Sequence, residues 1–319
     1  MFGTHCAIVF QAINHLLEFS MKKLLLATAV ATALAAPVAA LAQAKSPHTV
    51  TGNLSLNSDY RFRGISQTFG KPALQGGVDY SHSSGLYLGG WGSNVYGGAT
   101  NQTLGQSYNQ GNLELDIYGG YKFEPIKDVT ADLGILTYIY PGAKYAVATN
   151  DKYTNTELYG ALGYKWFTAK YSHSITDYFG INNNTVGAGN TAVTGGCGIQ
   201  SNLGPANALI PTTTCAGINK GGSKGSGYLD LGATFEIGMG VNLGLHYGKL
   251  KVKNYGLFNY SDTKISLSKD WMGFTWMAAY VDANAKSDVY RTSKVNGGGS
   301  PTLYDPSKST VVVSVAKTF

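Results

Sequence analysis

Apolar and polar residues alternate at every second position along most of this chain, from His48 to the carboxy-terminus, and no helical period is present. Successive side chains of a strand point to opposite faces, so this period indicates extended strands. The sequence therefore predicts an all-β protein. The twelve predicted strands cover 48–63, 73–83, 85–96, 112–124, 129–140, 155–166, 168–178, 227–238, 240–250, 260–270, 272–282 and 308–319.

The first and last strands show the alternation most clearly. In the first, the apolar face carries Val50, Leu54, Leu56, Tyr60 and Phe62, and the strand is longer than the usual five or six residues of a soluble strand. A tilted strand that crosses a membrane needs about 9–11 residues. The last strand ends on an aromatic residue, Phe319, as the closing strand of an outer-membrane barrel does. An amphipathic strand in a soluble β-sandwich would alternate in the same way.

The lengths of the predicted connections favour the membrane barrel. Very short turns at 83–85, 124–128, 167, 238–240 and after 270 alternate with longer connections. The longer set covers 64–72, 97–111, 141–154, 179–226, 251–259 and 283–307. Outer-membrane barrels have short periplasmic turns and longer extracellular loops. We therefore predict an antiparallel up-and-down transmembrane β-barrel of about twelve strands, with both ends of the barrel sequence on the periplasmic side.

Aromatic residues gather at one set of strand ends. Those beside the short turns or the terminus are Phe123, Trp166, Phe167, Trp271, Phe274 and Phe319. Such a belt is expected where a barrel meets the membrane interface. Tyr60, Phe62 and Tyr280 are expected at the opposite interface. Lys269 and Lys317 fall in the lipid-facing register near the periplasmic edge, where a lysine side chain can reach water.

The amino-terminal segment is predicted to be a leader. Met21 is followed by two lysines, an apolar stretch and a small-residue cleavage site that ends at Ala44. This order is typical of a Sec signal peptide over 21–44. Residues 1–20 are interpreted as an upstream start-site extension, the alternative being an unusually long n-region of the signal peptide. The mature barrel is then 45–319.

Composition excludes two classes of protein. The net charge of +6 is scattered without a basic block, which argues against nucleic-acid binding. After the leader no apolar run reaches 18 residues, which excludes a helical membrane protein. Two cysteines, Cys197 and Cys215, remain after the leader, and no histidine lies near them to suggest a metal site. We expect them to form a disulfide in the 179–226 loop, free thiols being the alternative.

Several segments resemble the TorF family of putative porins. They are SDYRFRGISQT (58–68), PALQGGVDY (72–80), WGSNV (91–95), ELDIYGGY (114–121), YIYPG (138–142), TELYG (156–160), YLDLG (228–232) and HYG (246–248). The likeness covers 45–319, with the Cys197/Cys215 loop and Lys317 as departures. It implies a porin-type barrel in the outer membrane of a Gram-negative bacterium.

Charged and polar residues in the inward register are the candidate pore-lining groups. They are Asp59, Arg61, Arg63, Gln75, Asp79, Glu114, Asp116, Lys122, Asp132, Glu157, Lys165, Lys170, Asp230, Glu236, Asp262 and Lys264. They either pair across the interior as a structural network or face an open lumen and create a transverse field. Twelve strands lie between small filled barrels and wide porins, so we expect a narrow channel. The 179–226 loop either folds in as a constriction or lies at the surface.

The predicted function is passive diffusion of small polar solutes or ions through an outer-membrane porin, without a cofactor or a metal. Expected partners are the outer-membrane lipid, small solutes and the barrel assembly machinery, which would recognise the C-terminal strand through Phe319. A non-conducting structural or adhesive barrel is the alternative. A barrel enzyme is disfavoured because His173 and its neighbours Ser172 and Ser174 point to opposite faces.

Overall fold

The computed structural model describes residues 46–96, 111–144, 152–182, 221–286, 290, 292–294 and 302–319. The predicted extension and signal peptide, over 1–44, lie outside the described residues. So do Cys197, Cys215 and most of the 179–226 loop. These predictions therefore stay predictions.

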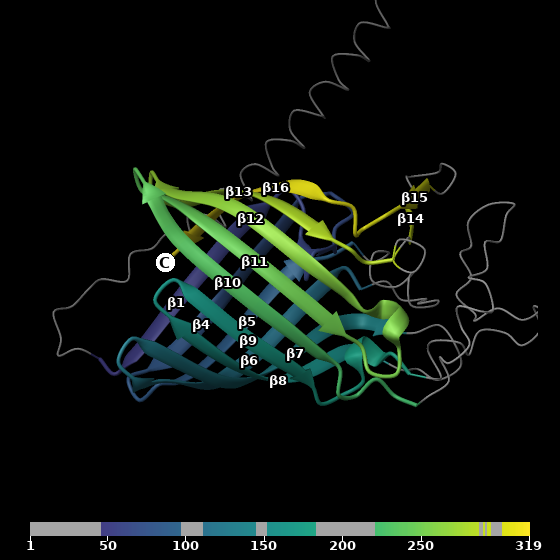
Figure 1. Cartoon of the computed structure of the whole chain (residues 1–319), viewed down its shortest axis with the longest axis horizontal. Helices are drawn as coiled ribbons and strands as arrows, with labels where there is room; N and C mark the ends of the chain where they lie inside the picture. Colours follow the sequence, from purple (N-terminus) through teal and green to yellow (C-terminus); the bar gives the residue numbers. More distant parts are fainter. Residues whose placement is uncertain are drawn as a thin grey trace, which may run out of the picture. The chain divides into compact units, whose positions relative to one another are not determined.

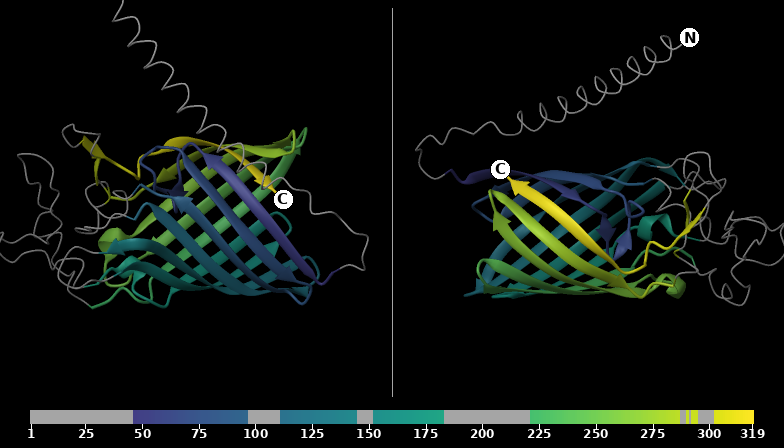
Figure 2. Two further views of the ribbon diagram at one scale, coloured as in Figure 1. Left: turned by 180° about the vertical axis from the view of Figure 1, so that it is seen from behind. Right: turned by 90° about the horizontal axis from the view of Figure 1, so that it is seen from above.

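Twelve strands form a closed antiparallel barrel, in which β1 pairs with β16 and every other neighbouring pair follows chain order (Figure 1). The strands are β1 (His48–Asn57), β4 (Ala73–His82), β5 (Leu86–Asn94), β6 (Leu113–Ile126), β7 (Val129–Lys144), β8 (Lys152–Tyr164), β9 (Phe167–Ser174), β10 (Gly227–Gly238), β11 (Val241–Lys251), β12 (Tyr260–Trp271), β13 (Phe274–Ala283) and β16 (Thr310–Thr318). They are strongly tilted, as closure of a sheet requires (Figure 2).

Short elements occupy the connections. β2 (Arg61–Phe62) pairs with β3 (Ile65–Ser66), and β14 (Thr292–Lys294) pairs with β15 (Thr302–Tyr304). Two single-turn helices, η1 (Tyr178–Gly180) and η2 (Gly256–Phe258), follow β9 and β11. No helix among the described residues has the length and apolar character that spanning a membrane requires.

The predicted sorting of connections is confirmed. Tight turns join β4 to β5, β6 to β7, β8 to β9, β10 to β11 and β12 to β13, and the longer connections lie at the other end of the barrel (Figure 1). At 239–240 and 272–273 both turn residues have positive φ, 56° and 71° in the first and 52° and 77° in the second. Two positive φ values characterise the type I′ turn, whose twist matches that of the flanking strands.

Apolar side chains cover the outside of the barrel, and polar side chains face the inside. On β6, the outward-facing Leu115 and Ile117 are 38% and 56% exposed, whereas the inward-facing Glu114 is fully buried. A soluble sandwich would bury the leucine and isoleucine instead. An apolar exterior around a polar interior is the arrangement of a transmembrane barrel, because lipid rather than water surrounds it.

The aromatic belt lies where the sequence predicts it. Phe123, Trp166, Phe167, Trp271 and Phe274 are exposed next to the short turns, and Phe319 is also exposed. Tyr280 is exposed towards the opposite end, as expected. Lys317 places its ammonium 5.3 Å from the centre of the Phe274 ring. Tyr60 and Phe62 do not belong to a belt, because they lie inside the barrel.

The packed core lies inside the barrel, at the end that carries the long connections. It joins side chains of the wall with side chains of those connections, among them Ile65, Tyr138, Phe179, Tyr228 and Phe258. This core determines how much of the interior is open.

Candidate functional site in the barrel interior

The chain leaves the barrel wall at the end of β1 and folds inward. Residues 58–72, here called the inner hairpin, contain β2 and β3 joined by a turn at Arg63 and Gly64, whose φ values are 48° and 80°. Ser58 marks the exit: its backbone nitrogen donates to the oxygen of Val313, and its hydroxyl accepts from the Val313 nitrogen, both at 2.9 Å. The predicted first strand over 48–63 was therefore too long, since β1 ends at Asn57.

The inner hairpin spans the interior, because it contacts strands on different sides of the barrel. The Tyr60 hydroxyl donates to Glu114 of β6 at 3.1 Å. A Cβ atom added to Gly64 would lie 2.6 Å from Cβ of Asp262 on β12 and 3.0 Å from Cβ of Ala283 on β13. Both the close approach and the positive φ require glycine at this position.

Asp59 organises the hairpin from within. One of its carboxylate oxygens accepts from the Ser66 hydroxyl at 2.6 Å, the Thr68 hydroxyl at 2.9 Å and the Gly70 nitrogen at 3.1 Å. The other accepts from Nε of Arg61 at 2.5 Å. Arg61 also donates to the backbone oxygens of Gly64, Pro306 and Lys308 at 2.8–3.1 Å. Both charges are thus used to hold the hairpin, and neither lies on a wall strand.

Arg63 ties the tip of the hairpin to the wall. Its Nη2 donates to both oxygens of Glu157 on β8 at 2.8 and 2.9 Å, and its Nη1 donates to the Tyr178 hydroxyl at 3.2 Å. The guanidinium also lies 4.2 Å from the centre of the Tyr228 ring. Burial is the largest single effect and would lower the pKa of Arg63, but the charge and hydrogen bonds of Glu157, together with Tyr178 and Tyr138, raise the pKa above its ordinary value. The buried pair therefore stays ionised.

The beginning of the 179–226 loop also turns inward. Phe179, with a φ of 46°, is buried against Phe62 of the hairpin and Tyr138 and Tyr153 of the wall, at ring-centre distances of 5.4–5.7 Å. Ser223, near the end of the loop, accepts from the Tyr178 nitrogen at 2.8 Å. Both described ends of the loop thus help to close the interior, and the part between them lies outside the described residues.

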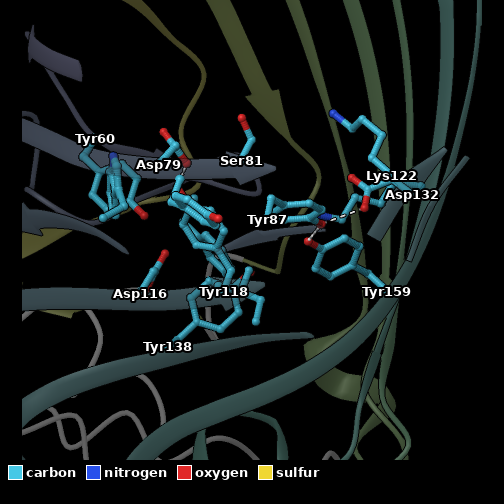
Figure 3. Close-up of a pocket in the computed structure, with 15 residues that line it drawn as sticks. Tyr60, Asp79, Ser81, Tyr87, Asp116, Tyr118, Lys122, Asp132, Tyr138 and Tyr159 are labelled. Carbon is cyan, nitrogen blue, oxygen red and sulfur yellow. Dashed lines mark hydrogen bonds between the residues drawn. The ribbon is translucent and has the colours of Figure 1, made fainter. Parts of the chain in front are cut away.

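A cavity of about 630 Å³, here called the tyrosine cavity, lies between the hairpin and the wall strands β4 to β9 (Figure 3). The Tyr118 hydroxyl donates to Asp79 at 2.5 Å, and the Tyr87 hydroxyl donates to Asp132 at 2.6 Å and contacts the Tyr159 hydroxyl. The remaining lining includes Tyr60, Phe62, Trp91, Asp116, Lys122, Tyr138 and Lys170. Lys170 holds its ammonium 4.0 Å from the centre of the Tyr159 ring.

A second cavity of about 270 Å³ lies on the other side of the hairpin. His246 bridges two carboxylates there, with Nδ1 3.0 Å from Asp230 and Nε2 2.8 Å from Asp262. Asp262 also accepts from the Tyr228 hydroxyl at 3.0 Å. Lys264 lines the same cavity.

Most of the predicted pore-lining residues lie inside the barrel, but in two different settings. Asp59, Arg61, Arg63, Glu114 and Glu157 are buried in the hairpin and its contacts. Arg61 and Arg63 of the hairpin also line the second cavity. The candidates on the wall strands that line one of the cavities are Asp79, Asp116, Lys122, Asp132, Lys170, Asp230, Asp262 and Lys264.

The other three candidates lie elsewhere. Gln75 accepts from Asn57 at 2.8 Å on the wall, and Glu236 is exposed near the short-turn end of β10. Lys165 is not on the wall, because it forms the exposed turn between β8 and β9 with a φ of 51°. The predicted strand 155–166 ended two residues beyond the end of β8 at Tyr164.

The tyrosines of the interior were not predicted as site residues. Tyr118 and Tyr159 occupy the inward register together with charged residues, which is the signal that could have identified them. Tyr228 shares its register with Asp230 on β10 and carries the same signal. Tyr178 gave no such signal, because it lies outside the strands, in η1.

Two kinds of reactive site are relevant to the described residues, a serine–histidine pair and a metal site. His173 is exposed while Ser172 and Ser174 are buried, so they face opposite sides as predicted. No group of three or more His, Cys, Asp or Glu side chains in the described part of the chain could hold a metal ion. What remains is a polar, aromatic interior suited to binding or passing a solute.

The chain is similar to several solved structures, among them two porins. The KdgM porin is 6% identical, with 84% of this chain and 99% of that chain covered and a TM-score of 0.42. The NanC porin is 9% identical, with 85% and 98% covered and a TM-score of 0.41. OprD of Pseudomonas aeruginosa is 11% identical, with 86% and 66% covered and a TM-score of 0.33.

Comparison with curated proteins found no match. Comparison with protein families did: one family model matches residues 41–319, which include every barrel strand. The chain therefore belongs to the family described as "Bacterial protein of unknown function (Gcw_chp)".

Proposed function

We propose that this protein is an outer-membrane channel through which small polar solutes or ions diffuse passively. The observation that carries the proposal is the distribution of side chains: an apolar exterior encloses an interior that carries charged groups and two cavities. Such a barrel needs lipid on the outside, and its polar interior offers a path for polar solutes.

Several features support the outer membrane as its location. The closed β-barrel, the short turns at one end and the aromatic belt are all typical of outer-membrane barrels. The resemblance to TorF putative porins and the signal peptide proposed over 21–44 agree with export. Insertion by the barrel assembly machinery through the C-terminal strand and Phe319 belongs to the same proposal.

The inner hairpin favours a second candidate, a structural barrel that conducts nothing. Its contacts with β6, β8, β12 and β13 fill the interior at the end with the long connections. A channel of this form conducts weakly unless the hairpin moves.

Single-channel recording in planar bilayers distinguishes the two candidates. Folded protein is expected to give discrete openings of small conductance, and a variant in which a short Gly/Ser turn replaces residues 58–72 is expected to give a larger conductance. Silence of both proteins over many verified insertions would reject the channel and leave the structural barrel.

A further inference from the structure

We propose that the Asp116 end of the tyrosine cavity is a binding site for a protonated organic amine. The inference rests on the proposed function in one respect, since it names the class of solute that the channel would select. The binding itself is independent of conduction and can be measured separately.

Asp116 is a carboxylate without a counter-ion. The ion pairs among the described residues use Asp59, Glu157, Asp230 and Asp262, and none uses Asp116. Its Oδ1 atom is buried and has no hydrogen-bond partner within the described part of the chain. A buried carboxyl oxygen without a partner is costly, and an ammonium ligand that supplies an N–H donor would stabilise its ionised form.

A second carboxylate strengthens the negative potential at this end. Glu114 lies two residues earlier on the inward face of β6 and is fully buried. One of its oxygens accepts from the Tyr60 hydroxyl, and its Oε2 has no partner among the described residues. Burial, followed by the charges of Glu114 and Asp116, raises the pKa of Tyr60. The Tyr60 hydroxyl therefore stays protonated and can donate a hydrogen bond.

Tyrosine rings lie at the same end of the cavity as Asp116 (Figure 3). Tyr60, Tyr118 and Tyr138 line the cavity together with Asp116, and Lys122 lies beside Asp132 at the far end. Tyr60 packs edge-on against Trp91 with ring centres 5.6 Å apart, and Phe62 does the same with Tyr138 at 5.3 Å. The rings are thus held in place by their neighbours. Ring faces attract a cation, most strongly where water is excluded.

The combination of an unpaired carboxylate and ring faces selects a cation with an apolar body. Neither an anion nor a neutral polyol brings the positive charge that would stabilise ionised Asp116 and Glu114. The opposite end of the cavity already shows the preferred contact, because the Lys170 ammonium lies 4.0 Å from the centre of the Tyr159 ring. A volume of about 630 Å³ leaves room for more than an inorganic ion.

Three probes of similar shape test the charge requirement: cyclohexylammonium, cyclohexanol and cyclohexanecarboxylate. Isothermal titration calorimetry on the folded protein in detergent is expected to detect binding of the ammonium ion only. Asp116→Asn keeps the size of the side chain and removes its charge, and it should weaken binding by about tenfold or more. Asp270→Asn, at an exposed position near the end of β12 and outside the cavity, removes the same charge and should leave the affinity unchanged.

Two results would overturn the site. The first is that cyclohexanol and the ammonium ion bind with equal affinity. The second is that the Asp116→Asn variant binds the ammonium ion with unchanged affinity, although its heat-modifiable migration on a gel shows that it is folded. Conductance without ammonium binding rejects the site and leaves the channel standing. Ammonium binding by a protein that never conducts rejects the channel and leaves the site standing.

Discussion

β1 and the inner hairpin follow each other in the chain and share one alternation of side chains, yet they meet opposite surroundings. In β1, Val50 and Leu56 point outward and are 66% and 50% exposed. In the hairpin, Tyr60 and Phe62 occupy the next positions of the same series and pack against Trp91 and Tyr138 in the interior. An alternating pattern therefore determines the extended conformation, and the neighbouring strands determine which environment each face meets.

The Arg63–Glu157 pair tests whether the hairpin is held by charge. Arg63→Ala leaves a buried carboxylate without its bidentate partner, and the expected loss of stability is about 3–5 kcal/mol. The measurement is equilibrium unfolding of the barrel in lipid vesicles by urea. Lys264→Ala, which removes a cation from the second cavity, serves as the control and should change stability by about 1 kcal/mol or less. Equal effects of the two variants would show that the pair does not hold the hairpin.

A charge placed on the outer face of the barrel tests whether the wall strands face lipid. Val78 lies in the middle of β4 and is 58% exposed, so Val78→Arg places a guanidinium in lipid. The expected cost is about 2–4 kcal/mol near the bilayer midplane. Thr234→Arg introduces the same group in the inward register of β10, where water reaches it, and should cost far less. A similar cost for both would contradict the lipid-facing assignment.

A substitution at the tip of the hairpin is expected to reduce the stability of the barrel less than the two preceding substitutions. Gly64→Ala combines a positive φ with a Cβ atom that would clash with Asp262, and we expect a loss of about 1–3 kcal/mol. Gly240→Ala has a positive φ but open space around the new Cβ atom, so it measures backbone strain alone. The difference in unfolding free energy between the two variants reports the packing of the tip. No difference would mean that the tip does not dock against β12 and β13.

Alkaline pH is expected to have the smallest effect on the docking of the hairpin. Burial raises the pKa of Tyr178 to about 12, above the ordinary tyrosine value of about 10. The stability that this shift represents is fully present below pH 10 and is lost as the pH rises through 12. Docking of the hairpin should thus be constant from pH 7 to 10, as followed by conductance. Tyr178→Phe, which cannot ionise, should remove the loss above pH 10; loss of docking already at pH 8 would contradict the burial of Tyr178.

The wall could be predicted closely from the sequence, and the interior could not. β10 occupies Gly227–Gly238, the range that the alternation predicts, because each strand of a barrel has lipid on one side and a polar interior on the other. The inward charges Asp116 and Asp132 followed from the same register. The pairing of Arg63 with Glu157 did not, since it joins residues 94 apart in the chain.

The error at the first strand has a physical cause. Tyr60 and Phe62 alternate with Asp59, Arg61 and Arg63 because a two-stranded hairpin also has two faces, one apolar and one polar. Only the turn at Arg63 and Gly64, with its two positive φ values, distinguishes the hairpin from a continued wall strand. Such a turn is evident in the backbone but is weakly marked in the sequence.

The most direct test of this account is the solvent around spin labels placed one at a time from β1 into the hairpin. Val50→Cys, Leu56→Cys, Tyr60→Cys and Phe62→Cys would be labelled in lipid vesicles, and collisions with oxygen and with a water-soluble nickel complex would be measured by electron paramagnetic resonance. We predict that oxygen dominates at positions 50 and 56 and that both collision rates are low at 60 and 62. Oxygen dominance that continues through position 62 would contradict the inner hairpin, and nickel dominance at 50 and 56 would contradict the membrane barrel itself.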